Sequence, residues 1–220
     1  MLNSSSRFMT TLRGRLGRPR FRLSEDGRPK VLITSGNVRK QGSIVQAIGF
    51  DVLLCSPGEW FIGQKVVLGF LSQFSNVELA IPGRVHWREQ KQSEVEMGIV
   101  LDEQIPDEFV VQESGCARKS IRYPSNIVGT LNWLEPHSVS YAASVVNYSR
   151  EGICLQSEVT PQIGTELQFS WLRDSVAYSV TGLSRWVIGK SGGALTGCEL
   201  TNSFGYAISG LSVNSGRASL

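Results

Sequence analysis

Two groups of side chains in the C-terminal half have the types and spacing needed to bind an anionic, hydrogen-bonding ligand. The first group is RKSIR, which places Arg118 and Arg122 four positions apart with Lys119 between them. A guanidinium group pairs with phosphate oxygens or with the O6 and N7 edge of guanine, and it also stacks on bases. Such a pair taken alone is more often a solvated charge run.

The second group is NYSREG, residues 147–152, which lies between the apolar runs YAASVV and ICLQS. Alternate residues of an extended segment face the same side, so Asn147 and Ser149 present an amide and a hydroxyl together. Gly152 permits a close backbone approach or an unusual turn angle. The same residue types also build ordinary turns between strands, which is the commoner interpretation of this segment in isolation.

An internal repeat supplies the elements that position these groups. Residues 56–70, SPGEWFIGQKVVLGF, align without gaps with residues 157–171, SEVTPQIGTELQFSW. GRVHW at 83–87 aligns with GLSRW at 182–186, and one later glycine in each copy keeps that spacing, Gly98 and Gly197. Two related modules are therefore predicted.

Apolar residues alternate with polar ones in both copies, as in Val52 and Leu54 and in Ile153 and Leu155. A period of two predicts strands with one buried face, and turn-forming residues separate them. We therefore predict an all-β fold of two tandem antiparallel modules, each a small β-barrel or sandwich, with short helical segments, one of them around residues 204–208. Closing each sheet also removes exposed strand edges.

The predicted organisation has four parts: a basic N-terminal arm over 1–30, a first barrel over 31–114, a second barrel over 115–205 and a polar tail over 206–220. Hydrophobic residues make up 41% of the chain and charged residues 19%, which is enough apolar surface for folded cores. Residues 1–40 hold ten Lys or Arg against two acids, so this segment is either a solvated arm or a contact for phosphates, anionic lipid or an acidic partner.

The cysteines and the hydropathy pattern bear on the cellular compartment. No early apolar run resembles a secretory signal, and no segment is long and apolar enough to span a bilayer. The cysteines stand far apart without metal or redox spacing, at Cys55, Cys116, Cys154 and Cys198. We expect them to be reduced and the protein to be cytoplasmic.

Together the two groups resemble the signature of the PilZ domain family. That signature is R-x-x-x-R, then [D/N]-x-S-x-x-G, then a late glycine before a final apolar strand. The matching residues are Arg118, Arg122, Asn147, Ser149, Gly152 and Gly197. The resemblance covers residues 117–201 and implies a six-stranded antiparallel barrel with a helix beside it, which binds the bacterial second messenger cyclic di-GMP. Lys119 is expected to add a phosphate contact.

The first copy is expected to be a degenerate PilZ-like barrel that contacts a protein partner or the second barrel. Superposing the repeat puts Gln46, Ile48 and Asp51 at the positions of Asn147, Ser149 and Gly152, which removes the hydrogen-bonding wall. A second arginine pair, Arg18 and Arg22, precedes this copy, so a partial ligand site there is the alternative. Ligand binding is expected to order the arginine segment and change the arrangement of the barrels.

Two other classes of function compete with this prediction. Catalysis has little support, since His86 and His137 are the only histidines and no nucleophile, base and acid cluster by motif. A nucleic-acid-binding barrel could stack bases on its tryptophans, but alternating strand positions favour packing in the core, and no nucleic acid is expected as a partner. A protein-only adaptor is the remaining alternative. Ligand stoichiometry and oligomeric state are left open.

Overall fold

The computed structural model describes residues 27–70, 79–106, 109–111, 118–133 and 139–211. The chain divides into two compact units, Met1–Ile121 and Arg122–Leu220, and each is described by itself. The predicted boundary near residue 114 and most of the basic arm, including Arg18 and Arg22, fall outside the described residues, as do Cys116 and His137.

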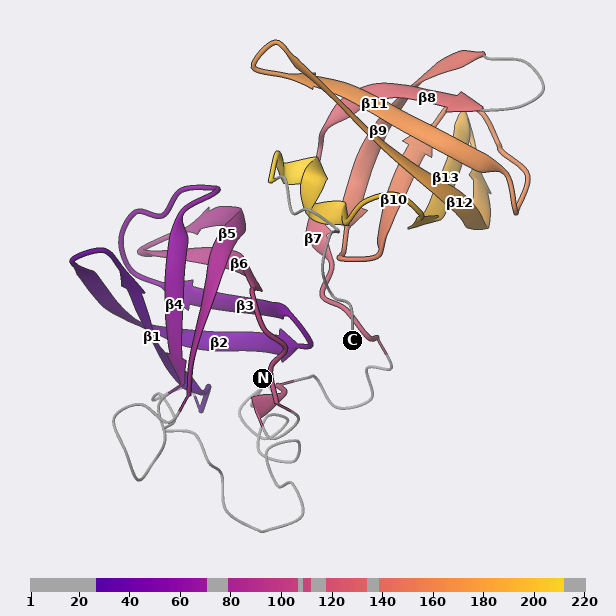
Figure 1. Cartoon of the computed structure of the whole chain (residues 1–220). Coiled ribbons are helices and arrows are strands. Elements are labelled where there is room, and N and C mark those ends of the chain that lie inside the picture. The colour runs from indigo at the N-terminus through magenta and orange to yellow at the C-terminus, as the bar shows by residue number, and fades with distance from the viewer. Residues whose placement is uncertain (1–26, 71–78, 107–108, 112–117, 134–138, 212–220) are drawn as a thin grey trace. The chain divides into compact units, whose positions relative to one another are not determined.

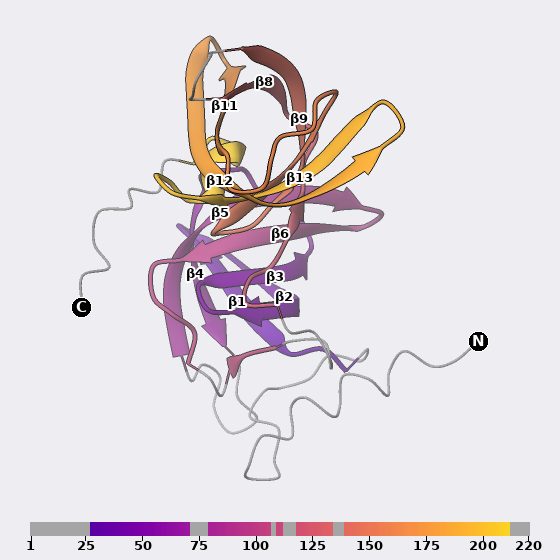
Figure 2. The ribbon, with the colours of Figure 1, turned by 90° about the vertical axis from the view of Figure 1, so that its right-hand side faces the viewer.

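The first unit is a closed six-stranded antiparallel barrel, with strand order β1-β2-β3-β6-β5-β4. Its strands are β1 (Lys30–Ser35), β2 (Val38–Ile48), β3 (Asp51–Ser56), β4 (Lys65–Phe70), β5 (Leu79–Lys91) and β6 (Glu94–Leu101). Pairing of β1 with β4 closes the ring, so no strand edge of this sheet is left over. Figures 1 and 2 show the strands wrapped around the interior.

The second unit repeats this architecture and adds one short strand. Its elements are β7 (Tyr123–Pro124), β8 (Val128–Trp133), β9 (Ser140–Tyr148), β10 (Gly152–Ser157), β11 (Glu166–Arg173), β12 (Val176–Lys190), β13 (Gly193–Leu200) and the 3-10 helix η2 (Gly205–Ser209). The order β10-β13-β12-β11-β8-β9 closes because β9 also pairs with β10. The seventh strand, β7, pairs with β9 (Figure 1). The predicted tandem of six-stranded antiparallel barrels is confirmed.

The repeat extends to irregular details of the two barrels. The β5–β6 ladder shifts register between Val85 and Trp87, and the β12–β13 ladder shifts between Ser184 and Trp186. The loop before β4 turns at Gly63 with φ of 86°, and the loop before β11 turns at Gly164 with φ of 88°. A left-handed backbone there requires glycine, which explains why both copies carry it.

Alternating strand residues build the cores, as the period-two pattern predicts. The first core includes Trp60, Val31, Ile33, Ile44, Leu54, Leu68, Phe70, Met97 and Ile99. In the second unit the rings of Phe169 and Trp171 stack at 5.6 Å, and that of Trp171 stacks on Tyr178 at 5.5 Å. Trp60 and Trp171 are buried, so these two indoles pack in cores rather than on the surface.

The short helix expected around residues 204–208 is present as η2. It buries Tyr206 and Ile208, and Leu211 after it is also buried. The sequence placed the start of a polar tail at residue 206, but these apolar side chains pack against the unit as far as residue 211. The helix ends at Gly210, which takes a left-handed φ of 83°.

One pair of ionisable side chains is enclosed in the first unit. The Nε2 atom of His86 lies 3.8 Å from Oδ1 of Asp51, and both residues are almost fully buried. Burial lowers the pKa of His86 to about 3, so this imidazole is neutral beside Asp51 at neutral pH. Asp51, which the repeat aligns with Gly152, is therefore packed inside the barrel.

This buried histidine makes a prediction about acid stability. His86 has a lower pKa in the folded chain than in the unfolded chain, so the unfolded state takes up its proton first as the pH falls below about 6.5. Between pH 7 and pH 5 the wild type should lose about 2 kcal/mol more free energy of unfolding than His86→Gln. Urea unfolding of both proteins at the two pH values measures this, and equal losses would contradict a neutral, buried His86.

Candidate functional site

The second unit brings one arginine of the RKSIR segment to the end of the NYSREG strand. Tyr123 pairs with Tyr148 and Pro124 with Asn147 in an antiparallel ladder. Their rings pack against each other, with the centroids of Tyr123 and Tyr148 5.7 Å apart. Arg122 directly precedes the paired Tyr123, and Ser149 directly follows the paired Tyr148, so these two residues lie next in the chain at this end of the ladder.

Asn147 and Ser149 lie on either side of a buried tyrosine. Tyr148 points into the core, while Asn147 and Ser149 are half-buried. This agrees with the expectation that the amide and the hydroxyl face the same side of the strand end. Ser149 then closes a tight turn, since its backbone N–H donates to the carbonyl oxygen of Gly152 at 2.8 Å.

Gly152 is required by the neighbouring strand. A Cβ atom at this position would lie 2.7 Å from the backbone carbonyl oxygen of Cys198 in β13. The sequence left open a close approach or an unusual turn angle, and the structure confirms the close approach. The alternative, an unusual turn angle, is wrong, because Gly152 is not among the residues with positive φ. Any larger residue would push β10 away from β13.

The helix η2 holds the turn from outside. The N–H of Gly205 donates to the carbonyl oxygen of Arg150 at 2.9 Å. The guanidinium carbon of Arg150 lies 4.7 Å from the ring centroid of Phe204, which is a cation–π contact. A Cβ atom at Gly205 would overlap the backbone oxygen of Ser149. The sequence motif did not predict this contact between η2 and the turn. The only sequence feature that corresponds to it is the glycine at position 205.

The other two predicted cations belong to the first unit. Arg118 and Lys119 are exposed residues near its end, whereas Arg122 is exposed in the second unit. Of the six predicted site residues, the second unit thus contains Arg122, Asn147, Ser149 and Gly152. The roles of Arg118 and Lys119 remain a prediction.

The corresponding place in the first unit is occupied differently. Ala47 of β2, the counterpart of Tyr148, forms a two-way backbone bridge with Val111. A segment that follows the first barrel therefore fills the edge position that β7 fills in the second. Ile48 and Asp51, where the second unit has Ser149 and Gly152, are buried. These contacts favour a structural role for this end of the first barrel over a partial ligand site.

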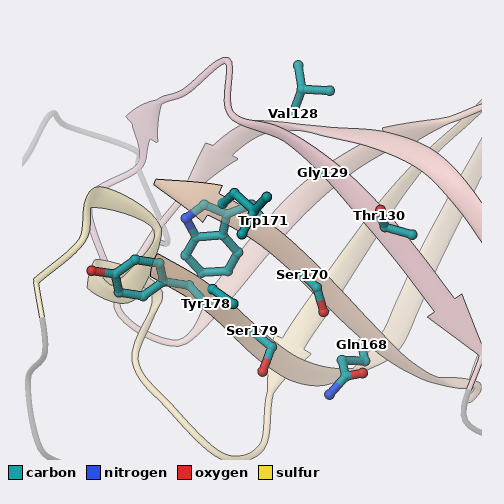
Figure 3. Close-up of a pocket in the computed structure, with 10 residues that line it drawn as sticks. Val128, Gly129, Thr130, Gln168, Ser170, Trp171, Tyr178 and Ser179 are labelled. Carbon is teal, nitrogen blue, oxygen red and sulfur yellow. The ribbon is translucent and has the colours of Figure 1, made fainter. Parts of the chain in front are cut away.

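A separate groove lies on the outer face of the second barrel, over β8, β11 and β12 (Figure 3). The alternation of β11 places Gln168 and Ser170 on this face and Phe169 in the core. No charged side chain is among the residues that line it, which are Val128, Gly129, Thr130, Gln168, Ser170, Trp171, Leu172, Ala177, Tyr178 and Ser179. Without a cation, this groove is poorly suited to phosphates.

Of the comparisons with protein families, curated proteins and solved structures, only the comparison with solved structures gives matches. No protein-family model matches the chain, and no curated protein matches it. The solved structures include the Bacillus subtilis inhibitor of motility MotI/DgrA, which is 12% identical with a TM-score of 0.33 and is aligned over 83% of this chain and 91% of that chain.

Two further solved structures are complexes with c-di-GMP. MrkH of K. pneumonia is 14% identical with a TM-score of 0.29, over 79% of each chain. YcgR of Escherichia coli is 7% identical with a TM-score of 0.33, over 91% of this chain and 84% of that chain.

The described residues also limit other kinds of site. Among them, no group of three or more His, Cys, Asp or Glu side chains could hold a metal ion. Within the same ranges, no helix is long and apolar enough to cross a membrane.

Proposed function

We propose that this chain is a bacterial receptor for cyclic di-GMP and that its second barrel binds the ligand. The observation that carries the proposal is the β7–β9 pairing, in which Tyr123, the residue after Arg122, pairs with Tyr148, the residue between Asn147 and Ser149. The resemblance of these residues to the PilZ signature supports the same ligand. Both arguments concern the same edge of the barrel.

Each residue has a role that its chemistry allows. Arg118 and Arg122 bind the phosphates or the guanine edges and stack on a base, and Lys119 adds a phosphate contact. Asn147 and Ser149 supply hydrogen bonds from the strand end. Gly152 lets the turn that carries Ser149 lie close to β13, which holds this strand end against the barrel.

The protein acts in this proposal as an effector without catalysis. Binding fixes the arginine segment against the second barrel, and the arrangement of the two units changes so that a surface of the first unit meets a protein partner. Only a ligand that binds one arrangement more tightly can drive such a change. The protein-only adaptor and the nucleic-acid-binding barrel are the competing functions.

Calorimetric titration with cyclic di-GMP tests the binding step. We expect saturable binding to the wild-type chain and none of comparable affinity for GTP, which lacks the second guanine and the cyclic phosphate backbone. Titration at rising salt separates the competing function, because nucleic-acid binding falls steeply with salt while a pocket that uses stacking and hydrogen bonds loses less. An absence of heat with cyclic di-GMP, together with salt-sensitive binding of oligonucleotides, would overturn the proposal.

The switch step needs its own measurement. Small-angle scattering of the free and the saturated chain should give two different curves. Identical curves at saturation would remove the change of arrangement and leave the binding untouched.

A further inference from the structure

The loop before β4 presents two adjacent apolar side chains to solvent. Phe61 is 59% exposed and Ile62 is 40% exposed, at the tip of a turn that ends in Gly63. The backbone below them is fixed, because Gly63 N–H donates to the Val85 carbonyl at 2.7 Å. The N–H of Phe61 donates to Oε1 of Gln64 at 3.0 Å. A rigid turn therefore holds this apolar pair outward.

Cations surround the same loop. Nη1 of Arg88 donates to the Trp60 carbonyl at 2.6 Å, and its guanidinium carbon lies 5.9 Å from the ring centroid of Phe61. Nζ of Lys40 lies 5.8 Å from the ring centroid of Trp60.

Two further cations continue this surface across β4 and β5. Lys65, at the start of β4, faces Arg84 directly in the β4–β5 ladder, and both side chains are exposed. No ion pair joins Lys40, Lys65, Arg84 or Arg88 to an acid within the described ranges, so their charges are available to an anionic partner.

The second barrel has the same loop with one exposed apolar residue but without the aromatic residue and the cations. Gly164 N–H donates to the Ser184 carbonyl at 2.8 Å, as Gly63 does to Val85, and Ile163 is 68% exposed where Ile62 stands. At the positions of Phe61, Lys65, Arg84 and Arg88 this copy has Gln162, Glu166, Leu183 and Val187. The exposed aromatic ring and the basic residues are thus specific to the first copy and are not a requirement of the fold.

We propose that this loop, residues 57–64, docks the first unit on an anionic lipid surface. Phe61 and Ile62 enter the interfacial region, while Lys40, Lys65, Arg84 and Arg88 meet the phosphates of the headgroups. Aromatic side chains favour this depth, and lysine and arginine keep their charges at the headgroups while their stems lie along apolar surface.

The size and charge of the surface favour lipid over a protein partner. A stable protein interface takes about 800 Å² from each side with a well-packed centre, and two apolar side chains at one turn provide only a small part of this. Lipid binding needs only a shallow apolar insertion combined with attraction between basic residues and anionic lipid. The inference is independent of cyclic di-GMP binding, since none of its residues lies in the proposed ligand site.

Vesicle co-sedimentation of the full chain tests the proposal. We expect binding to phosphatidylglycerol-containing vesicles, weak binding to pure phosphatidylcholine and release at high salt. Phe61→Ser with Ile62→Ser should reduce vesicle affinity at least about tenfold, and so should Lys65→Glu with Arg84→Glu. Ile163→Ser is the matched control, because it removes the equivalent exposed isoleucine from a loop without cations, and it should bind as the wild type does.

Every variant keeps the basic residues 1–26, so their contribution to vesicle affinity is the same throughout. Unchanged binding of the Phe61, Ile62 double variant would overturn the proposal, as would an equal loss in the Ile163 control. The proposal would also be overturned if the wild type did not bind anionic vesicles. If the wild type instead bound an acidic protein through these same residues, the partner of this loop would be a protein and not lipid.

Discussion

Replacing both Arg118 and Arg122 by alanine is expected to weaken cyclic di-GMP binding by about 2–4 kcal/mol, which is roughly 30-fold to 1,000-fold in Kd. The two guanidinium groups supply charge-assisted hydrogen bonds to the ligand that alanine cannot replace. Arg122 is exposed beside the strand end that carries Asn147 and Ser149, so its loss should affect ligand contact more than stability. Calorimetric titration of the variant and the wild type gives the difference.

The control for this prediction removes the same charge elsewhere. Arg39 and Arg84 are exposed arginines of the first unit, and neither belongs to the proposed site. Arg39→Ala with Arg84→Ala should bind cyclic di-GMP within about twofold of the wild type, because exposed charges that do not contact the ligand are screened by salt. An equal loss in both double variants would show that net charge, and not these two arginines, governs binding.

Replacing Gly205 by alanine is expected to have the second large effect. The added Cβ atom would overlap the backbone oxygen of Ser149, so either η2 or the turn that ends at Gly152 has to move. Forcing an atom into such a packed contact costs about 1–3 kcal/mol of stability. Because the turn carries Ser149, affinity for cyclic di-GMP should fall as well. Urea unfolding and calorimetric titration of the same variant measure the two effects.

Gly189→Ala provides the matched comparison. Gly189 lies in β12, and a Cβ atom there would meet nothing within 4 Å. This variant makes the same chemical change at an open position of the same barrel, so its stability and affinity should stay close to those of the wild type. If Gly205→Ala behaved in the same way, the contact between η2 and the turn would have no part in holding the site.

The fold was predictable because the repeat and the alternation are local properties of the chain. Val52 with Leu54 and Ile153 with Leu155 indicated strands with one buried face, and these residues lie in β3 and β10. The glycines with positive φ that precede β4 and β11, Gly63 and Gly164, occupy the same position in the two copies of the repeat. Closure of each ring depended on pairs such as β1 with β4, which alternation alone does not specify.

The candidate site was predictable only in part. The resemblance picked out Arg122, Asn147 and Ser149, and the β7–β9 ladder brings this set to one edge. The contribution of η2 was missed because it depends on a packing contact between Gly205 and Ser149, which are far apart in the sequence. Such long-range contacts leave no periodic signal in the chain.

The first unit shows a similar limit. The alignment of Asp51 with Gly152 did not reveal its burial beside His86, because that burial depends on the register of β3 and β5 with β6. The bridge between Ala47 and Val111 was equally hidden, because the segment that forms it follows the barrel and lies outside the repeat. Superposing one copy on the other identified the equivalent positions of the two barrels correctly, but it did not predict which residues surround those positions in the first barrel.

A crystal structure of the chain grown with excess cyclic di-GMP tests the central claim most directly. It should show the ligand at the strand end formed by β7 and β9, with the guanidinium groups of Arg118 and Arg122 on its phosphates or guanines and with Asn147 and Ser149 within hydrogen-bonding distance. A ligand bound in the outer groove over β8, β11 and β12 would contradict the account. So would an empty strand end with both arginines directed into solvent.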